Sequence, residues 1–124
     1  MLSRKVEDYL EAILNVVEEK GYAKTRDVAR VLNITSPSVV EMLKKLHKMD
    51  LIVYRKYDGA TLTPRGKEIA ASVKERHNVI KEFLELIRVS KEVAERDACL
   101  LEHSLDPKTI RQLKDLVNLI KKHT

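Results

Sequence analysis

The sequence contains no tryptophan, one phenylalanine and one cysteine, and only three glycines and three prolines among its 124 residues. Because Cys99 cannot form an intrachain disulfide, we expect a reducing compartment. No apolar run approaches the roughly 18 residues that a membrane-spanning helix needs, and acidic residues interrupt the segment where a signal peptide would be apolar. No glycine- or serine-rich linker and no repeat is apparent. These absences predict a cytoplasmic protein without a membrane partner.

Charge, in contrast, is abundant and unevenly distributed. The formal net charge is +5, the pI is about 9.3 and 35% of the residues are charged. Residues 20–67 contain eleven Lys and Arg against four Asp and Glu, whereas residues 1–19 contain two against five. A basic central segment favours a polyanionic partner, most simply nucleic acid. A highly charged surface of the kind found in heat-stable proteins is the alternative explanation.

The first half of the chain has the pattern of a winged helix-turn-helix. Apolar residues at helical spacing predict a helix over residues 4–20. Thr25 can cap a second helix that ends at Asn33, and Ser36 can cap a third with Pro37 at its first position. Two short helices separated by about three residues are typical of a helix-turn-helix. Residues 51–64 then predict a strand, an Asp-Gly turn and a second strand, which form the wing.

The second half is predicted to be entirely helical. Thr63 and Pro64 start a long helix that reaches about residue 88, Ser90 opens another that reaches about Ser104, and Asp106 caps the last. The last helices have apolar faces but are too few to form a core of their own, which favours a helical dimer interface. We therefore predict a mainly α fold. A winged helix-turn-helix DNA-binding domain spans residues 1–70, and an all-helical dimerisation domain spans residues 71–124.

Residues 35–48 would form the recognition helix in the DNA major groove. Helix N-termini and hydroxyl groups bind phosphates, short side chains allow close approach, and basic residues of the preceding helix and the wing can contact the backbone. The alternative is a winged helix that binds protein, with these cations merely solvated. The residues predicted to contact DNA are Lys24, Thr25, Arg26, Thr35, Ser36, Pro37, Ser38, Lys44, Arg55, Lys56 and Tyr57.

Several residues have the chemistry of metal ligands. Cys99, Glu102 and His103 fall on one helical face at i, i+3 and i+4, so a thiolate, a carboxylate and an imidazole can converge. The alternative is that Cys99 packs in the core and that Glu102 and His103 are an ordinary solvated pair. Asp8 and Glu11 lie beside the apolar stripe of the first helix, where they can face a neighbouring helix. The alternative is that they simply place favourable negative charge near the helix N-terminus. His77 is predicted to face inward in the long helix, where a packed histidine is the commoner case.

The chain resembles the diphtheria-toxin-repressor family of metal-dependent transcriptional regulators, close to its manganese-transport-regulator branch. The resemblance covers nearly the whole chain. It depends on VEDYLEAILNVVEEKGYAKTRDVARVLNITSPSVVEMLKKL, YDGATLTPRGKEIA, RHNVIKEFL and DACLLEH. It implies a homodimer that binds a palindromic double-stranded operator when metal joins the first helix to the dimerisation helices, and that represses metal-uptake genes. The metal ligands that the resemblance implies are Asp8, Glu11, His77, Cys99, Glu102 and His103.

The identity of the metal stays open at this point. Manganese-type members of the family pair the aspartate at position 8 with a glutamate where this chain has Cys99, and iron-type members have the cysteine but a methionine at position 8. Hard oxygen ligands suit Mn²⁺ and Fe²⁺, whereas a thiolate shifts the preference toward Fe²⁺, Co²⁺ or Zn²⁺. We expect Mn²⁺ or Fe²⁺, with Co²⁺, Zn²⁺ or Cd²⁺ able to substitute.

Three other functions fit parts of the sequence. An enzyme with Cys99 as nucleophile and His103 as base lacks an evident third catalytic group and a glycine-rich oxyanion loop, so no enzymatic activity is predicted. A winged-helix redox sensor could use the Cys99 thiol. A constitutive DNA-binding protein could carry a purely structural metal site.

Overall fold

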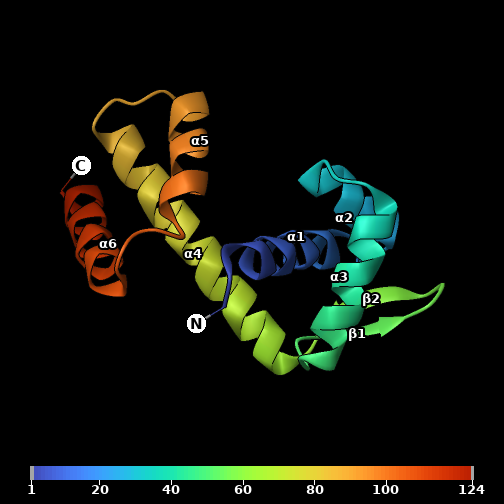
Figure 1. Cartoon of the computed structure of the whole chain (residues 1–124). Helices are drawn as coiled ribbons and strands as arrows, with labels where there is room; N and C mark the ends of the chain where they lie inside the picture. Colours follow the sequence, from blue (N-terminus) through green and yellow to red (C-terminus); the bar gives the residue numbers. More distant parts are fainter. Residues whose placement is uncertain (1, 124) are drawn as a thin grey trace. The chain divides into compact units, whose positions relative to one another are not determined.

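The computed structural model describes residues 2–123, which divide into two compact units (Figure 1). The first unit ends at Ser72 and the second begins at Val73, so the long helix α4 (Pro64–Leu86) contributes to both. The fold is mainly helical, as predicted, with one two-stranded antiparallel hairpin in the first unit. No helix in the described part of the chain has the length and apolar character needed to cross a membrane.

The N-terminal unit is built on three helices: α1 (Arg4–Lys20), α2 (Thr25–Leu32) and α3 (Ser36–Lys48). Helix α1 has the predicted bounds because the Ser3 hydroxyl accepts a hydrogen bond from the Val6 N–H, and Gly21 ends the helix with φ of 88°. Helix α1 contacts α2 and the hairpin, and α2 contacts α3. Apolar side chains from these elements form one core, which includes Leu10, Ile13, Val28, Leu43 and Leu46.

Two predicted helix caps were wrong by one residue. Helix α2 is capped at Lys24 rather than Thr25, because the buried Asp27 carboxylate accepts the Lys24 backbone N–H at 3.1 Å. Helix α3 is capped at Thr35 rather than Ser36, and the Thr35 hydroxyl lies 2.9 Å from the Ser38 hydroxyl. Asn33 adopts φ of 55° between the two helices, as predicted, and this left-handed residue makes the sharp turn.

The predicted wing is present as strands β1 (Ile52–Arg55) and β2 (Gly59–Leu62). Arg55 pairs with Gly59 across the tip, where Tyr57 adopts φ of 74°. At the base of the hairpin, the backbones of Ala23 and Ala60 exchange hydrogen bonds of 2.9 and 2.8 Å. The segment between α1 and α2 is therefore joined to the wing.

The start of α4 packs very closely on the loop before the wing. The Thr63 hydroxyl donates to the Asp50 carbonyl at 2.8 Å and accepts the Gly66 N–H at 3.0 Å. A Cβ added to Gly66 would lie 1.8 Å from the Leu51 carbonyl oxygen. Only glycine allows the two backbones to approach this closely.

The C-terminal unit contains the remainder of α4, helix α5 (Lys91–Leu101) and helix α6 (Pro107–Lys122). The Ser90 and Asp106 side chains cap α5 and α6 as predicted. Helix α4 ends at Leu86, earlier than predicted, and α5 ends at Leu101 rather than near Ser104.

A small apolar core joins the three helices of this unit. Val79 and Ile80 of α4 pack with Ala98 of α5 and Ile110 of α6. Ile87 lies beyond the end of α4 and is exposed.

Candidate nucleic-acid interface and metal centre

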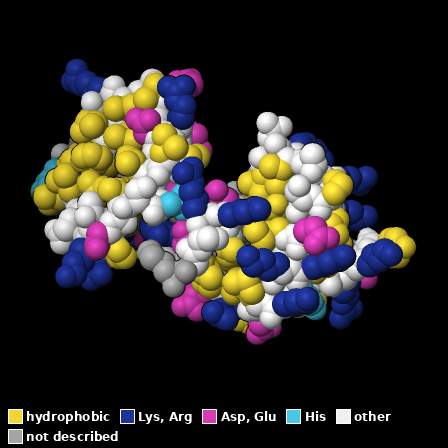
Figure 2. Space-filling model, viewed as in Figure 1, with side chains coloured by type: hydrophobic (Ala, Val, Ile, Leu, Met, Phe, Trp, Pro, Cys, Tyr) yellow, Lys and Arg dark blue, Asp and Glu magenta, His cyan; other side chains and the backbone are white. Residues whose placement is uncertain are grey.

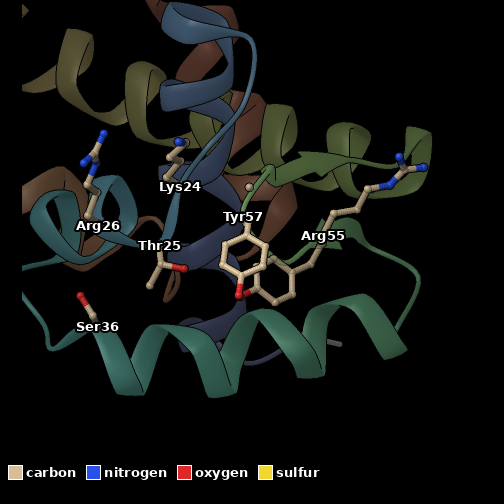
Figure 3. A pocket seen from close by; sticks show the side chains of 8 residues that line it. Lys24, Thr25, Arg26, Ser36, Arg55 and Tyr57 are labelled. Atoms are coloured by element: carbon tan, nitrogen blue, oxygen red, sulfur yellow. The ribbon is translucent and has the colours of Figure 1, made fainter.

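Helices α2 and α3 and the hairpin surround a groove of about 320 Å³ in the N-terminal unit (Figure 3). Lys24, Thr25 and Arg26 come from the start of α2, Ser36 from the start of α3, and Arg55 and Tyr57 from the hairpin. The groove is thus lined by cations, hydroxyl groups and phenol rings, which together suit a sugar-phosphate backbone. Six of the residues predicted to contact DNA are the ones just named.

Local contacts fix the walls of this groove. The Asp27 carboxylate lies 2.9 Å from Lys20 Nζ and 3.3 Å from an Arg30 guanidinium nitrogen, and it holds the Lys24 N–H. The Lys20 ammonium, together with that backbone N–H and the Arg30 charge, lowers the pKa of Asp27 against the opposing effect of burial. On the opposite wall, Tyr54 donates its backbone N–H to His47 Nδ1 at 3.2 Å, which joins the hairpin to the end of α3.

The remaining predicted DNA contacts lie on α3 and at the wing tip. Thr35, Pro37 and Ser38 are exposed at the start of α3. Lys44 lines a second hollow of about 470 Å³ between α3 and the start of α1. Lys56 is exposed at the wing tip, with its ammonium 5.4 Å from the centre of the Tyr57 ring.

Sequence reasoning missed two residues of the second hollow. Lys5 and Lys48 line it together with Lys44 and Lys45. Helical periodicity around the buried positions of α3 would have indicated Lys48, but Lys5 comes from a different helix. Figure 2 shows Lys and Arg side chains distributed over the lobe that contains the wing.

The candidate metal ligands of the C-terminal unit surround His77 of α4. The Nδ1 atom of His77 lies 3.2 Å from Glu102 Oε2 and 3.9 Å from Cys99 Sγ. The Nε2 atom of His103 lies 3.2 Å from Glu102 Oε1. The structure therefore brings these four predicted ligands together at the end of α5, and the inward orientation predicted for His77 is confirmed by its burial.

Burial and charge make this cluster unusual. Glu102 is 2% exposed, and its Oε2 atom has no assigned hydrogen-bond partner among the described residues, although it lies 3.2 Å from His77 Nδ1. The Glu102 carboxylate is the main cause that raises the pKa of His77 to about 9, with Glu95 contributing and burial opposing. A buried carboxylate oxygen with spare lone pairs can accept a cation.

Glu95 and Lys81 are members of this region that sequence reasoning did not assign as ligands. Glu95 Oε1 lies 3.0 Å from His77 Nε2, and Glu95 Oε2 lies 3.2 Å from Lys81 Nζ. Glu95 precedes Cys99 by one helical turn on α5, and this i, i+4 spacing was the signal available in the sequence.

The other two predicted ligands belong to the N-terminal unit. Asp8 and Glu11 are half-buried and lie at i, i+3 on α1, so they share a helical face. Asp8 Oδ2 lies 3.9 Å from Arg4 Nε of the preceding turn.

Comparison with known families matches both units. Residues 1–60 match the N-terminal DNA-binding domain of the iron-dependent repressors, and residues 63–124 match their metal-binding and dimerisation domain. The chain belongs to the iron-dependent repressor family. This family member is a metal-dependent DNA-binding transcriptional regulator and not an enzyme.

Individual relatives cover most of this repressor-family chain. It is 42% identical over 117 residues to the HTH-type transcriptional regulator MntR of Geobacillus kaustophilus, covering 94% of this chain and 83% of the relative. It is 38% identical over 117 residues to MntR of Bacillus subtilis, with 94% and 82% covered. The solved structure of the manganese regulator SloR matches with a TM-score of 0.78 and 29% identity over 91% of this chain. The chain spans about half (53%) of the length of SloR.

Proposed function

We propose that this chain is a repressor that binds an operator in the cytoplasm when Mn²⁺ or Fe²⁺ is available. The observation that carries the proposal is the buried Glu102 carboxylate. Its Oε1 lies 3.2 Å from His103 and its Oε2 lies 3.2 Å from His77, and Oε2 has no assigned hydrogen-bond partner among the described residues. A buried carboxylate oxygen with unused lone pairs, flanked by imidazoles and a thiol, can serve as a metal ligand, so the residues present fit a divalent ion. The domain boundaries that accompany this proposal are residues 1–70 for DNA binding and 71–124 for metal binding and dimerisation.

The proposed ligands combine the two units. Glu102, His103, His77 and Cys99 come from the C-terminal unit, and the half-buried carboxylates of α1 are added from the N-terminal unit on the strength of the family resemblance. The full proposed set is Asp8, Glu11, His77, Cys99, Glu102 and His103. Three carboxylates in this set favour Mn²⁺ and Fe²⁺, which prefer oxygen ligands, while Co²⁺, Zn²⁺ or Cd²⁺ can substitute. The manganese regulator SloR, to whose structure the chain is similar, supports manganese.

The proposed switch is electrostatic. The carboxylates of Asp8, Glu11 and Glu102 repel one another, and a bound divalent ion replaces that repulsion with shared coordination. Coordination then fixes α1, and with it the winged helix that packs on α1, in the orientation that binds DNA. Metal and operator strengthen each other reciprocally, typically by about 1–3 kcal/mol.

The proposed DNA complex is a homodimer on a palindromic operator. Helix α3 would enter the major groove, while the cations lining the α2–wing groove hold the phosphates. The two recognition helices of the dimer would lie about 34 Å apart, one turn of DNA. Support for a dimer comes from the C-terminal unit, where Leu116 and Leu119 of α6 are exposed and hydrophobic side chains gather on one face (Figure 2).

Operator binding can be measured after duplexes have been selected from a random library with Mn²⁺-loaded protein. In gel-shift titrations, removing metal with a chelator should weaken binding at least about tenfold, and restoring Mn²⁺ or Fe²⁺ should recover it. Glu102→Gln should lose the metal response. Glu92→Gln, an equal charge change at an exposed position of α5, should keep it. Equal affinity with and without metal in the unaltered protein would disprove the proposal.

The exposure of Cys99 favours one second candidate, a thiol redox sensor. Cys99→Ser separates the two functions. A redox sensor would lose its entire response to oxidant, whereas a metal sensor would retain metal-dependent DNA binding with an altered metal preference.

A further inference from the structure

The wing has an outer edge that no strand covers in the part of the chain that the structure describes. Its sheet consists of β1 and β2, and Tyr54 of β1 lies directly opposite Ala60 of β2. Ala60 directs its N–H and its carbonyl away from β1, because both are bonded to the backbone of Ala23. Residues opposite each other in an antiparallel pair direct their backbone groups either both inward or both outward. The Tyr54 N–H is therefore directed out of the sheet.

The imidazole of His47 accepts this N–H. The Tyr54 nitrogen lies 3.2 Å from His47 Nδ1, and His47 belongs to the last turn of α3. A histidine nitrogen accepts a hydrogen bond only when it carries no proton, so this contact requires a neutral ring with its hydrogen on Nε2. The hairpin is thus attached at both edges, to Ala23 beside β2 and to His47 beside β1.

The two attachments differ in what can alter them. The bonds between Ala23 and Ala60 join backbone groups, which do not titrate near neutral pH. The attachment to α3 is made by an exposed side chain of the residue type that ordinarily gains a proton between about pH 8 and 5. A protonated imidazole carries a hydrogen on both nitrogens, so it would meet the Tyr54 N–H with an N–H of its own and could not accept it.

This attachment bears on DNA binding because of where β1 lies. Tyr54 and Arg55 line the groove that also contains the start of α2 and Ser36 of α3. The position of β1 relative to α3 therefore sets the width of the groove that is proposed to hold the DNA phosphates.

We propose that His47 is a positioning residue that attaches the wing to the recognition helix, and that its protonation releases the wing. Operator affinity then responds to pH through His47 as well as to metal. The inference rests on the proposed function, since it concerns the groove that is taken to bind DNA, but the contact itself involves none of the proposed metal ligands.

The surroundings of His47 offer a protonated ring little reason to stay beside β1. Cations outnumber carboxylates among the nearby groups, so a further positive charge is not favoured there. The charged or titratable groups within one turn of His47 on α3, in the following loop and on β1 are Lys44, Lys45, Lys48, Asp50, Tyr54 and Arg55.

Amide hydrogen exchange of Tyr54, followed by NMR on the metal-free full chain, tests the attachment without DNA. In the unaltered protein the protection factor of this amide should fall by about three- to tenfold between about pH 7.5 and 5.5, the loss that one hydrogen bond implies. His47→Ala should show the low protection at both pH values. His47→Asn should keep the high protection at both, because its side-chain oxygen can replace Nδ1 as an acceptor and does not titrate.

Operator affinity should follow the same pattern. With saturating Mn²⁺, fluorescence anisotropy should show that acidification weakens binding by the unaltered protein about three- to tenfold more than binding by His47→Asn. Acid also weakens metal binding, but it does so in both proteins, so the ratio of their affinities isolates His47. His123→Asn, the same change at the exposed C-cap of α6, should keep the full pH dependence. Circular dichroism should show all variants folded.

Three results would overturn the proposal. If Tyr54 protection does not change with pH, or is equal in His47→Ala and His47→Asn, the imidazole does not hold the wing. If acid weakens operator binding equally in the unaltered protein and His47→Asn, the attachment does not affect DNA binding. If acid strengthens binding by the unaltered protein relative to His47→Asn, a protonated His47 binds a phosphate directly.

The proposed function has its own readout, the Mn²⁺ dependence of operator binding. Operator binding that ignores Mn²⁺ in the unaltered protein would refute the proposed function, whatever the Tyr54 exchange shows. Mn²⁺-dependent binding together with pH-independent protection of Tyr54 would refute only the role of His47.

Discussion

The buried carboxylate of Glu102 lies 3.2 Å from Nδ1 of His77, which is itself only 8% exposed. This carboxylate is the main reason that the pKa of His77 rises from 6.5 to about 9, against the opposing effect of burial. Glu95, on the other side of the ring, adds to the rise. Without metal, His77 is therefore a cation at neutral pH and partly neutralises the cluster.

This relationship predicts how the stability of the metal-free protein depends on pH. Because the pKa of His77 is higher in the folded protein than in the unfolded chain, its contribution is fully present below about pH 6.5 and is lost as the pH rises through about 9. Urea unfolding in the presence of chelator should show this loss between pH 6.5 and 9. In His77→Gln the free energy of unfolding should fall less steeply with pH. Parallel curves for the two proteins would contradict the raised pKa of His77.

Arg55 of the wing is expected to contact a DNA phosphate. The side chain is exposed and lines the groove beside α2. Arg55→Ala should weaken binding to all duplexes nearly uniformly and reduce the slope of log affinity against log salt by about 1. Fluorescence anisotropy over a range of salt concentrations measures both. Lys108→Ala, an equal loss of charge at an exposed position of α6, should leave the slope unchanged.

Gly66→Ala should destabilise the N-terminal unit strongly. The added Cβ would lie 1.8 Å from the Leu51 carbonyl oxygen, so the start of α4 must move away from the loop before the wing. We expect a loss of about 3 kcal/mol in the free energy of unfolding, measured by urea denaturation. Lys67→Ala, at the next and exposed position, should change it by less than about 0.5 kcal/mol. Equal effects of the two substitutions would show that the close approach is unimportant.

Tyr9→Phe, in contrast to Gly66→Ala, should stabilise the protein. Tyr9 is 2% exposed, and its hydroxyl has no hydrogen-bond partner among the described residues. Removing the hydroxyl while keeping the ring should raise the free energy of unfolding by about 1 kcal/mol. Thermal and urea unfolding would detect the increase, with Tyr22→Phe as the control because Tyr22 is 41% exposed. A destabilised Tyr9→Phe protein would mean that the hydroxyl is satisfied after all.

Local signals explain why the order of helices and strands could be predicted from the sequence. Ser3, Gly21 and Asn33 act through their own backbone or that of residues within one turn, so their effects are visible in a short window. The start of α2 was misplaced because Asp27 takes up the Lys24 N–H and also meets Lys20 of another helix. A competition of that kind depends on packing, which periodicity does not describe.

The candidate site was predictable only in part for a similar reason. Cys99, Glu102 and His103 are close in sequence, so their helical spacing was enough to group them. The contacts of Glu95 with His77 and Lys81 depend on how α4 and α5 pack, and the two helices are separated in the sequence. The same holds for Gly66, whose close approach to Leu51 follows from the tertiary fold rather than from its neighbours in the chain.

At Tyr57 in the wing tip, the backbone conformation and the predicted contact with DNA favour different residues. Tyr57 is 85% exposed and adopts φ of 74°, a conformation that is unfavourable for a residue with a Cβ. The ring therefore contributes little to the core, and the backbone conformation at this position would suit glycine or asparagine better. Selection for heat resistance alone would tend to replace this tyrosine, and with it an aromatic surface next to Lys56. A more stable variant at this position would therefore lose the aromatic ring that is predicted to contact DNA.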